Sequence, residues 1–277
     1  MTLLGAAEIR ELAQELGIKP AKSLGQNFVI DANVCRKIVR TAGVTSSDIA
    51  LEIGPGLGSL TLALLEEAKE VIAVEIDERL AMRLPQTVEQ HNQSSAQFSV
   101  IHQDALTLKT LPVAPTVLVA NLPYNVSVPV LLHLLEIFPT LKSGVVMVQA
   151  EVADRLAAKP GTKEYGIPSV KAAWWADLQG AGSISRSVFW PIPGVDSKLV
   201  SFSRHQPLGD EALRLKVFTL IDAAFAQRRK MLRSALSGIY GSSAAAEKSL
   251  IEAGVDPTLR GESLLVNDFC AIARLGF

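Results

Sequence analysis

Short runs of β-branched and aliphatic residues alternate with segments in which apolar residues recur every three or four positions. The first pattern predicts strands and the second predicts amphipathic helices. The predicted strands are residues 49–53, 71–76, 98–102, 116–120, 145–149, 172–179 and 199–204. The helices predicted before and between them are residues 1–16, 31–42, 58–67, 78–90, 129–137 and 150–158. This alternation predicts an α/β fold: a doubly wound, Rossmann-like parallel sheet with antiparallel strands at one edge.

The alternation stops at a polar linker that contains Pro207 and Gly209. Beyond the linker every periodic segment is helical, and the predicted helices are residues 211–226, 228–236, 244–253 and 266–275. We therefore expect two domains. The first, residues 1–204, is the α/β domain with an N-terminal helical extension, and the second, residues 205–277, is a small helical domain.

Composition narrows the class of protein. Of the 277 residues 48% are hydrophobic and 20% are charged, which is ordinary for a globular chain. No apolar run reaches the roughly 18 residues of a membrane span, and acidic residues interrupt the first helix, unlike a signal peptide. Two cysteines and four scattered histidines match no disulfide framework or metal-binding spacing. The sequence thus predicts a cytoplasmic protein without a metal.

Charge is distributed unevenly along the chain. The net charge is −1, but residues 212–238 carry six basic side chains against one acidic side chain. That segment has a formal charge of +5, which leaves −6 for the rest of the chain. A basic patch on an otherwise acidic protein indicates a local site for a polyanion such as nucleic acid.

A glycine-rich turn follows the first predicted strand of the sheet. Gly54, Gly56 and Gly58 stand in a G-x-G-x-G spacing, and Glu75 follows at the tip of the next strand. Glycines there let the backbone approach a ligand, and a carboxylate at that strand tip binds the ribose of an adenosine-containing cofactor in such folds. A tight turn without a ligand would explain the glycines alone. Glycines and Glu75 together favour a nucleoside cofactor, either NAD or S-adenosylmethionine.

Asp104 follows the third predicted strand and has two interpretations. Its carboxylate can accept a hydrogen bond from the adenine amine of a cofactor, or it can cap the helix that follows. The NAD alternative lacks a catalytic His, Cys or Tyr-x-x-x-Lys in a matching place.

The motif Asn121-Leu122-Pro123-Tyr124 follows a strand of the predicted parallel sheet, where such sheets carry their active sites. The amine at N6 of adenine is a poor nucleophile because its lone pair is delocalised into the ring. The Asn121 side-chain oxygen and the backbone carbonyl of Leu122 or Pro123 can accept its two N–H groups in a non-planar arrangement. Tyr124 then offers a flat surface for the base. An Asn-Pro turn with a packed tyrosine is the structural alternative.

With these motifs the chain resembles the rRNA adenine N6,N6-dimethyltransferase family, which includes the macrolide-resistance methylases. The resemblance runs nearly end to end, through residues 23–28, 52–56, 75–77, 104–106, 121–124, 165–166, 189–197 and 225–230. The Asn-Leu-Pro-Tyr, Pro-x-Pro-x-Val-Asp-Ser and Gln-Arg-Arg-Lys stretches are more similar to the small-subunit (16S) branch. That branch dimethylates two adjacent adenosines near the 3′ end of small-subunit rRNA on a partly assembled subunit.

The resemblance implies roles for individual residues. S-adenosylmethionine would contact Asn27, the backbone at Val29, Gly54 with its loop neighbour Gly56, Glu75, Asp104 and Asn121. Tyr124 and Phe189 would sandwich the target adenine. Trp190 departs from the family pattern, which has a smaller polar residue there, and we expect it to pack in the core.

The basic cluster is Arg228, Arg229, Lys230 and Arg233. Arg228 falls on the apolar stripe of the preceding helix if that helix continues, so either the helix breaks near Gln227 or Arg228 is paired. We expect a break and contacts from these residues to RNA phosphates. Lys159, Lys163 and Lys171 would extend the surface.

Three other functions remain open. The chain could be an RNA-binding or assembly factor on a methyltransferase fold without catalysis, although its site motifs are intact. It could also be a DNA adenine methylase, which the small helical tail disfavours, or a resistance-type methylase of the large subunit. Our expectation is a monomeric enzyme that acts on rRNA within the small subunit and binds neither membrane nor metal.

Overall fold

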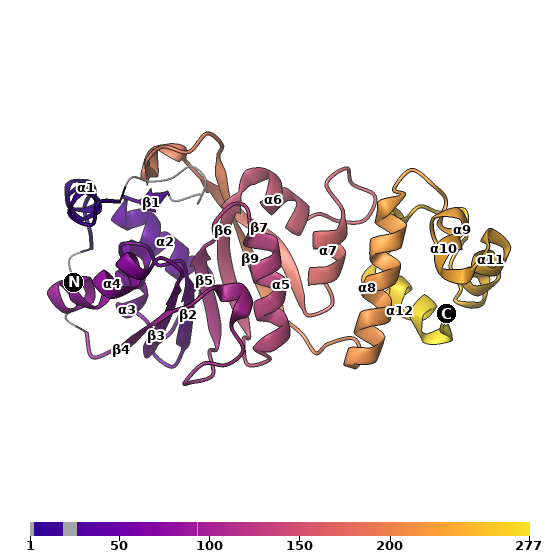
Figure 1. Cartoon of the computed structure of the whole chain (residues 1–277), viewed down its shortest axis with the longest axis horizontal. Helices are drawn as coiled ribbons and strands as arrows, with labels where there is room; N and C mark the ends of the chain where they lie inside the picture. Colours follow the sequence, from indigo (N-terminus) through magenta and orange to yellow (C-terminus); the bar gives the residue numbers. More distant parts are fainter. Residues whose placement is uncertain (1–2, 19–26, 93) are drawn as a thin grey trace. The chain divides into compact units, whose positions relative to one another are not determined.

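A seven-stranded sheet forms the centre of the fold in the computed structural model, which describes residues 3–18, 27–92 and 94–277 (Figure 1). Its strands are β2 (Ile49–Ile53), β3 (Glu70–Glu75), β4 (Gln97–His102), β5 (Val117–Asn121), β6 (Ser143–Gln149), β7 (Ala176–Ile184) and β9 (Ser197–Arg204). They lie in the order β4-β3-β2-β5-β6-β9-β7. The pairs β4–β3, β3–β2, β2–β5 and β5–β6 are parallel, and β9 runs antiparallel to β6. The predicted doubly wound sheet with an antiparallel edge is confirmed.

The helices between the parallel strands are α3 (Ser59–Leu65), α4 (Glu78–His91) and α5 (Ser127–Ile137). The chain moves outward from β2 through β3 to β4, then returns to β5 and moves the other way to β6. Because such crossovers are right-handed, α3 and α4 cover one face of the sheet and α5 covers the other. The direction of winding reverses between β2 and β5, and ligands bind at such switch points.

Local sequence signals explain where the helices begin and end. The predicted capping residues of α2 (Ala32–Ala42) are confirmed: the Asp31 carboxylate accepts the amides of Asn33 and Val34, at 2.8 and 3.3 Å. Gly43 ends this helix in the left-handed region, at φ 66°. The helix packs against α3, β5 and β6. Its apolar face therefore joins the core over the centre of the sheet.

One small ladder was not predicted from the hydrophobic pattern. Strands β1 (Phe28–Val29) and β8 (Phe189–Trp190) pair antiparallel, with Phe28 opposite Trp190 and Val29 opposite Phe189. Two-residue strands are too short to show a period. The Phe28 and Trp190 rings stack with centroids 6.4 Å apart, and Trp190 packs against the core as expected. This ladder fixes the segment that carries Asn27 and Phe28.

The chain divides into two compact units, one of residues 1–153 with 179–204 and one of residues 154–178 with 205–277. The first unit includes α1 (Ala6–Glu15) and η2 (Ala105–Thr107), together with η3 (Arg186–Val188). The helices of the second unit are α7 (Ile167–Ala172), α8 (Glu211–Ala226), α9 (Leu232–Ala235), α10 (Ser237–Tyr240), α11 (Ser243–Glu252), η4 (Gly261–Ser263) and α12 (Val266–Leu275), and α6 (Ala150–Leu156) spans the boundary.

This division differs from the expected one, residues 1–204 and 205–277, because residues 154–178 pack with the C-terminal helices. The Tyr165 hydroxyl donates to the Leu264 carbonyl at 2.7 Å, and the Trp175 and Phe218 rings meet nearly at right angles with their centroids 5.6 Å apart. The predicted strand 172–179 was wrong at its start, since α7 ends at Ala172 and a turn precedes β7. Tryptophan is common in strands, but here Trp174 and Trp175 are buried and both rings contact Phe218 of α8.

Candidate active site

Residues predicted for the cofactor and for the chemistry meet at the carboxyl ends of neighbouring strands. Gly54 follows β2, Glu75 ends β3, Asp104 follows β4 and Asn121 ends β5. They border a cavity of about 410 Å³, a size typical of small-molecule sites. The lining residues are Asn27, Phe28, Gly54, Glu75, Ile76, Asp77, Leu80, Asp104, Leu106, Asn121, Leu122, Pro123, Tyr124, Asn125 and Val126.

The glycine turn requires glycine for two different reasons. Gly54, Gly56 and Gly58 all have a positive φ, of 68°, 59° and 102°, which residues other than glycine rarely adopt. At Gly56 space is also limiting, because a Cβ would lie 3.0 Å from the Phe28 ring. The Gly56 amide donates to Glu75 Oε2 at 3.1 Å. The turn and the carboxylate are thus held together as one unit.

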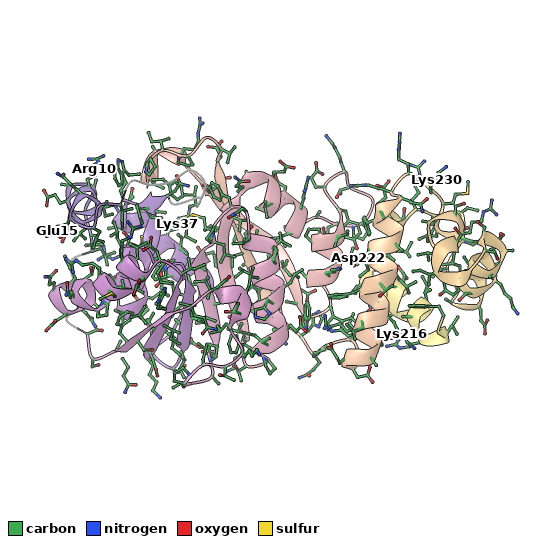
Figure 2. All side chains as sticks on the ribbon, viewed as in Figure 1. Arg10, Glu15, Lys37, Lys216, Asp222 and Lys230 are labelled. Carbon is green, nitrogen blue, oxygen red and sulfur yellow. The ribbon has the colours of Figure 1, made fainter. Side chains whose placement is uncertain are left out.

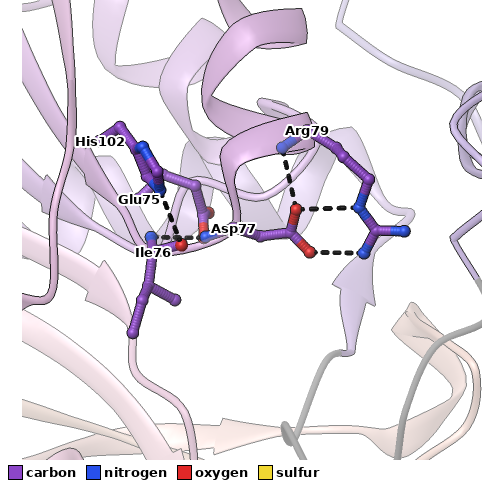
Figure 3. Close-up of polar contacts among 5 residues, drawn as sticks. All are labelled: Glu75, Ile76, Asp77, Arg79 and His102. Carbon is purple, nitrogen blue, oxygen red and sulfur yellow. Dashed lines mark hydrogen bonds and ion pairs between the residues drawn. The ribbon is translucent and has the colours of Figure 1, made fainter.

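Glu75 is held at the tip of β3 by backbone donors. Its Oε1 accepts the amides of Ile76 and Asp77, each at 2.9 Å, as Figure 3 shows. Only 5% of the residue is exposed, and this burial raises the pKa of Glu75 although the backbone donors oppose the shift. The adjacent Asp77 forms an ion pair with Arg79 at 2.7 Å, and this partner lowers the pKa of Asp77. The Glu75 carboxylate is therefore fixed in orientation at the edge of the cavity.

Asp104 caps a helix and also lines the cavity. Its Oδ1 accepts the amide of Leu106 at 2.9 Å at the start of η2, so the structural interpretation of this residue is confirmed. A carboxylate has two oxygens, and capping uses one of them. The cap therefore does not remove Asp104 from the candidate cofactor contacts, because the residue also borders the cavity.

The Asn121 amide group has a defined orientation. Its Nδ2 donates to the Asn27 carbonyl at 3.2 Å, which assigns Oδ1 to the acceptor position. The following amide, of Leu122, donates to the Met147 carbonyl at 3.1 Å. The Pro123 carbonyl accepts the amide of Val126 at 3.2 Å in the turn before α5. Of the two backbone acceptors considered for the adenine amine, Pro123 is thus already engaged in a turn.

The two aromatic residues expected to hold the base differ in exposure. Tyr124 lines the cavity, whereas Phe189 is 1% exposed and belongs to the core. Phe28 is an aromatic lining residue that the sequence reasoning gave no role, although it closes the quoted Ser-Leu-Gly-Gln-Asn-Phe motif. Residues 23–26 of that motif lie outside the described residues. Val29 borders a small adjoining recess of about 30 Å³ together with Asn27 and Gly54.

Glu52 is a buried acid immediately before the glycine turn, and sequence reasoning assigned it no role. It is 1% exposed, and its Oε2 accepts the Thr61 hydroxyl at 2.6 Å. Burial raises the pKa of Glu52 to about 8, and the nearby negative charge of Glu75 adds to the shift. Near neutral pH this side chain is therefore mostly protonated, which limits the buried charge beneath the cavity.

The basic cluster separates into paired and exposed members. Helix α8 ends at Ala226 and the next helix, α9, starts at Leu232, so the break near Gln227 is confirmed and the helix predicted over residues 228–236 was wrong at its start. Arg228 is also paired: it donates to Glu262 Oε2 at 2.6 Å and to the Lys163 carbonyl at 2.7 Å.

Other basic side chains of the second unit are likewise bound to acids. Arg233 contacts Glu247 at 3.2 Å, and Lys171 contacts Asp222 of α8 at 2.7 Å. Arg229 and Lys230 are exposed, and Figure 2 shows Lys230 just beyond the end of α8. The exposed members are consequently better placed for phosphate contacts than Arg228 or Arg233.

Neither a metal site nor a membrane-spanning helix is found among the described residues. In residues 3–18, 27–92 and 94–277 no group of three or more His, Cys, Asp or Glu side chains is placed to hold a metal ion. Within the same ranges no helix combines the length and the apolar character needed to cross a membrane.

Comparisons with known proteins agree with this geometry. The family model of ribosomal RNA adenine dimethylase matches residues 18–275. A protein of Streptomyces avermitilis named ribosomal RNA small subunit methyltransferase A is 60% identical over 275 residues, covering 98% of this chain and 93% of that protein. The crystal structure of a dimethyladenosine transferase from Plasmodium falciparum has a TM-score of 0.73 at 25% identity, covering 88% of this chain and 95% of its own.

The structure of the 23S rRNA methyltransferase ErmE is also similar, with a TM-score of 0.66 at 25% identity and coverage of 88% of this chain and 97% of its own. Both structures support the Rossmann-like methyltransferase fold. The family match covers nearly the whole chain, including every strand that borders the cavity. The chain belongs to the ribosomal RNA adenine dimethylase family, and is by that membership an rRNA adenine methyltransferase.

Proposed function

We propose that the protein transfers methyl groups from S-adenosylmethionine to N6 of two adjacent adenosines near the 3′ end of small-subunit rRNA, during ribosome assembly. The observation that carries the proposal is the position of Asn121-Leu122-Pro123-Tyr124. The first residue of the motif, Asn121, is the last residue of β5, and the motif lines the same cavity as Glu75 and Gly54 of the glycine turn. A methyl donor held by the turn would thus lie beside the groups that bind an amine.

The residues around the cavity fit S-adenosylmethionine. The Glu75 carboxylate, fixed by three backbone amides, would accept from the ribose hydroxyls. Asp104 would accept from the adenine amine of the cofactor, and Gly54 would let the backbone approach it. Asn27, Val29 and Gly56 complete the proposed cofactor contacts. The cofactor supplies an electrophilic methyl group, and the chain has to hold and orient the two reactants.

The chemistry that we propose needs no strong base. Asn121 Oδ1 and a backbone carbonyl accept the two N–H groups of the target amine, which shifts its lone pair out of conjugation with the ring. Because the Pro123 carbonyl already uses one of its two lone pairs on the Val126 amide, we assign the backbone acceptor first to Leu122, with Pro123 as the alternative. As the new N–C bond forms, the methyl–sulfur bond of the donor would break, the donor would leave as a neutral thioether, and the cationic amine would then release one proton to water. The two acceptors act most strongly on the positive charge that develops on the amine, so they favour the transition state over bound substrate.

The target base has to leave its stack to reach the cavity, as in other enzymes that modify bases. Tyr124 is our proposed stacking surface, and such stacking contributes about 1–3 kcal/mol per base. Phe189 has 1% of its surface exposed, so a contact with the base would require a rearrangement at β8. The proposal therefore rests on Tyr124 first, with Phe189 as a second surface.

RNA binding by the second unit is the remaining part of the proposal. Arg229 and Lys230 would contact phosphates directly, with Lys159 and Lys163 extending their surface. Arg228 and Arg233 would support those side chains through their own pairs with Glu262 and Glu247. The partner is rRNA within the small subunit, and the enzyme would act as a monomer in the cytoplasm, where the subunit is assembled.

Transfer of a labelled methyl group tests the proposal. The protein is incubated with S-adenosylmethionine labelled in its methyl group and, in parallel, with unmodified small subunits, large subunits and duplex DNA. We expect label on two adjacent adenosines of small-subunit rRNA, as N6-dimethyladenosine. Label on the large subunit would indicate a resistance-type methylase, label on DNA a DNA methylase, and subunit binding without transfer a non-catalytic factor. Each of these three results would overturn the proposal.

A further inference from the structure

The hydroxyl of Tyr124 has a partner far away in the sequence. It lies 3.1 Å from the Oγ of Ser197, which is the first residue of β9. Tyr124 belongs to the segment that lines the cavity after β5, and Ser197 comes from the antiparallel edge of the sheet. The hydrogen bond therefore joins Tyr124, the proposed stacking residue, to β9, a strand with no residue among those that line the cavity.

Ser197 is held rigidly. It is fully buried, at 0% exposure, and pairs with Gln149 in the ladder between β6 and β9. Next to it, the Asp196 carbonyl accepts the amide of Ala150 at 2.9 Å. The loop before Ser197 is fastened as well, because Arg186 binds the Asp196 carboxylate at 3.2 Å and the Gly194 carbonyl at 3.3 Å. The Ser197 hydroxyl thus has a fixed position in the first unit.

A tyrosine ring swings about its Cα–Cβ bond and turns about its Cβ–Cγ bond. The hydroxyl oxygen lies on the axis of the second bond, so a hydrogen bond at that oxygen fixes where the ring lies by restricting the first rotation. An aromatic surface stabilises a stacked base most when the ring is already in place before the base arrives. We propose that Ser197 is a positioning residue that holds the Tyr124 ring at the place where the target adenine stacks. This inference rests on the proposed function, because it assumes that Tyr124 receives the base.

The hydrogen bond is tested by removing each partner and then both. In Ser197→Ala the ring remains but loses its anchor, and in Tyr124→Phe the anchor remains but has no partner. Loss of one hydrogen bond of this kind should lower kcat for small subunits about five- to tenfold in either variant. The double variant should be no slower than either single variant, since both remove the same contact. The KM for the subunit and the affinity for S-adenosylmethionine should stay near their wild-type values.

Ser203→Ala is the matched control, because it makes the same substitution at an exposed position of the same strand. It should keep the wild-type kcat. If Ser197 merely stabilises β9, its replacement will lower kcat in the Tyr124→Phe background too, and this additive result would overturn the inference. A wild-type kcat in Tyr124→Phe would do the same even if Ser197→Ala failed to fold. Failure of the proposed function is recognised separately, as absence of transfer by the wild-type protein.

Discussion

The buried acid Glu52 predicts an unusual dependence of stability on pH. Its side chain is buried near the end of β2, just before the glycine turn, and burial raises its pKa from an ordinary value of 4.5 to about 8. A raised pKa in the folded state means that the folded protein binds the proton more tightly than the unfolded chain does. The stabilisation that the bound proton of Glu52 gives the folded state is therefore fully present below pH 4.5, and it is lost as the pH rises towards 8. Between these limits the free energy of unfolding should fall by about 1.4 kcal/mol per pH unit from this group.

Glu52→Gln removes the titration but keeps an oxygen that can accept the Thr61 hydroxyl. Urea unfolding of the ligand-free protein at about pH 5.5 and about pH 7.5 measures the effect. From the lower to the higher pH, the free energy of unfolding of the variant should rise relative to that of the wild type by at most about 3 kcal/mol. Glu67→Gln, at an exposed position just after α3, should leave the wild-type pH dependence unchanged. Parallel curves for Glu52→Gln and the wild type would refute the reasoning.

The remaining predictions concern ligands. S-adenosylmethionine, and not NAD, should raise the melting temperature by binding to the folded state, and Glu75→Ala should abolish most of that shift; an unchanged shift would contradict the ribose assignment. Asn121→Ala should lower turnover far more than subunit affinity, and near-normal turnover would contradict the acceptor mechanism. Replacing Arg229 and Lys230 should flatten the slope of log affinity against log salt by roughly 0.7–0.9 per lost phosphate contact, without lowering the melting temperature. Arg228→Ala should instead lower the melting temperature and leave the salt slope unchanged, because Glu262 loses its partner. A flatter salt slope at an unchanged melting temperature would show that Arg228 contacts a phosphate.

The parts of the fold that follow a long hydrophobic period were predictable from the sequence. Strand β2 and helices α8 and α12 have the predicted bounds, because each carries a run that buries one face or both faces. The helix caps at Asp31 and Gly43 were predictable from equally local signals. Residues that lie at the ends of consecutive parallel strands could also be grouped into one site, since the carboxyl ends of these strands share one edge.

Contacts between distant segments were not predictable, because no local pattern specifies them. The pairing of Arg228 with Glu262 joins positions 34 residues apart. The spacing of apolar residues showed only that a solvated charge is poorly placed at position 228. Likewise, the burial of Phe189 depends on its two-residue strand pairing with Val29. The packing of residues 154–178 with the C-terminal helices depends on aromatic contacts such as that between Trp175 and Phe218.

These distant contacts matter for the proposed chemistry as much as the motifs do. The side-chain oxygen of Asn121 can serve as the proposed acceptor only because its nitrogen donates to the Asn27 carbonyl. Asn27 is in turn held by the ladder that begins at Phe28 and pairs with Trp190. The orientation of one side chain at the end of β5 thus depends on a short strand near the N-terminus and another beyond β7. A substitution that breaks this ladder would allow the Asn121 amide to turn over and would remove the acceptor, although the Asn-Leu-Pro-Tyr motif itself would be intact.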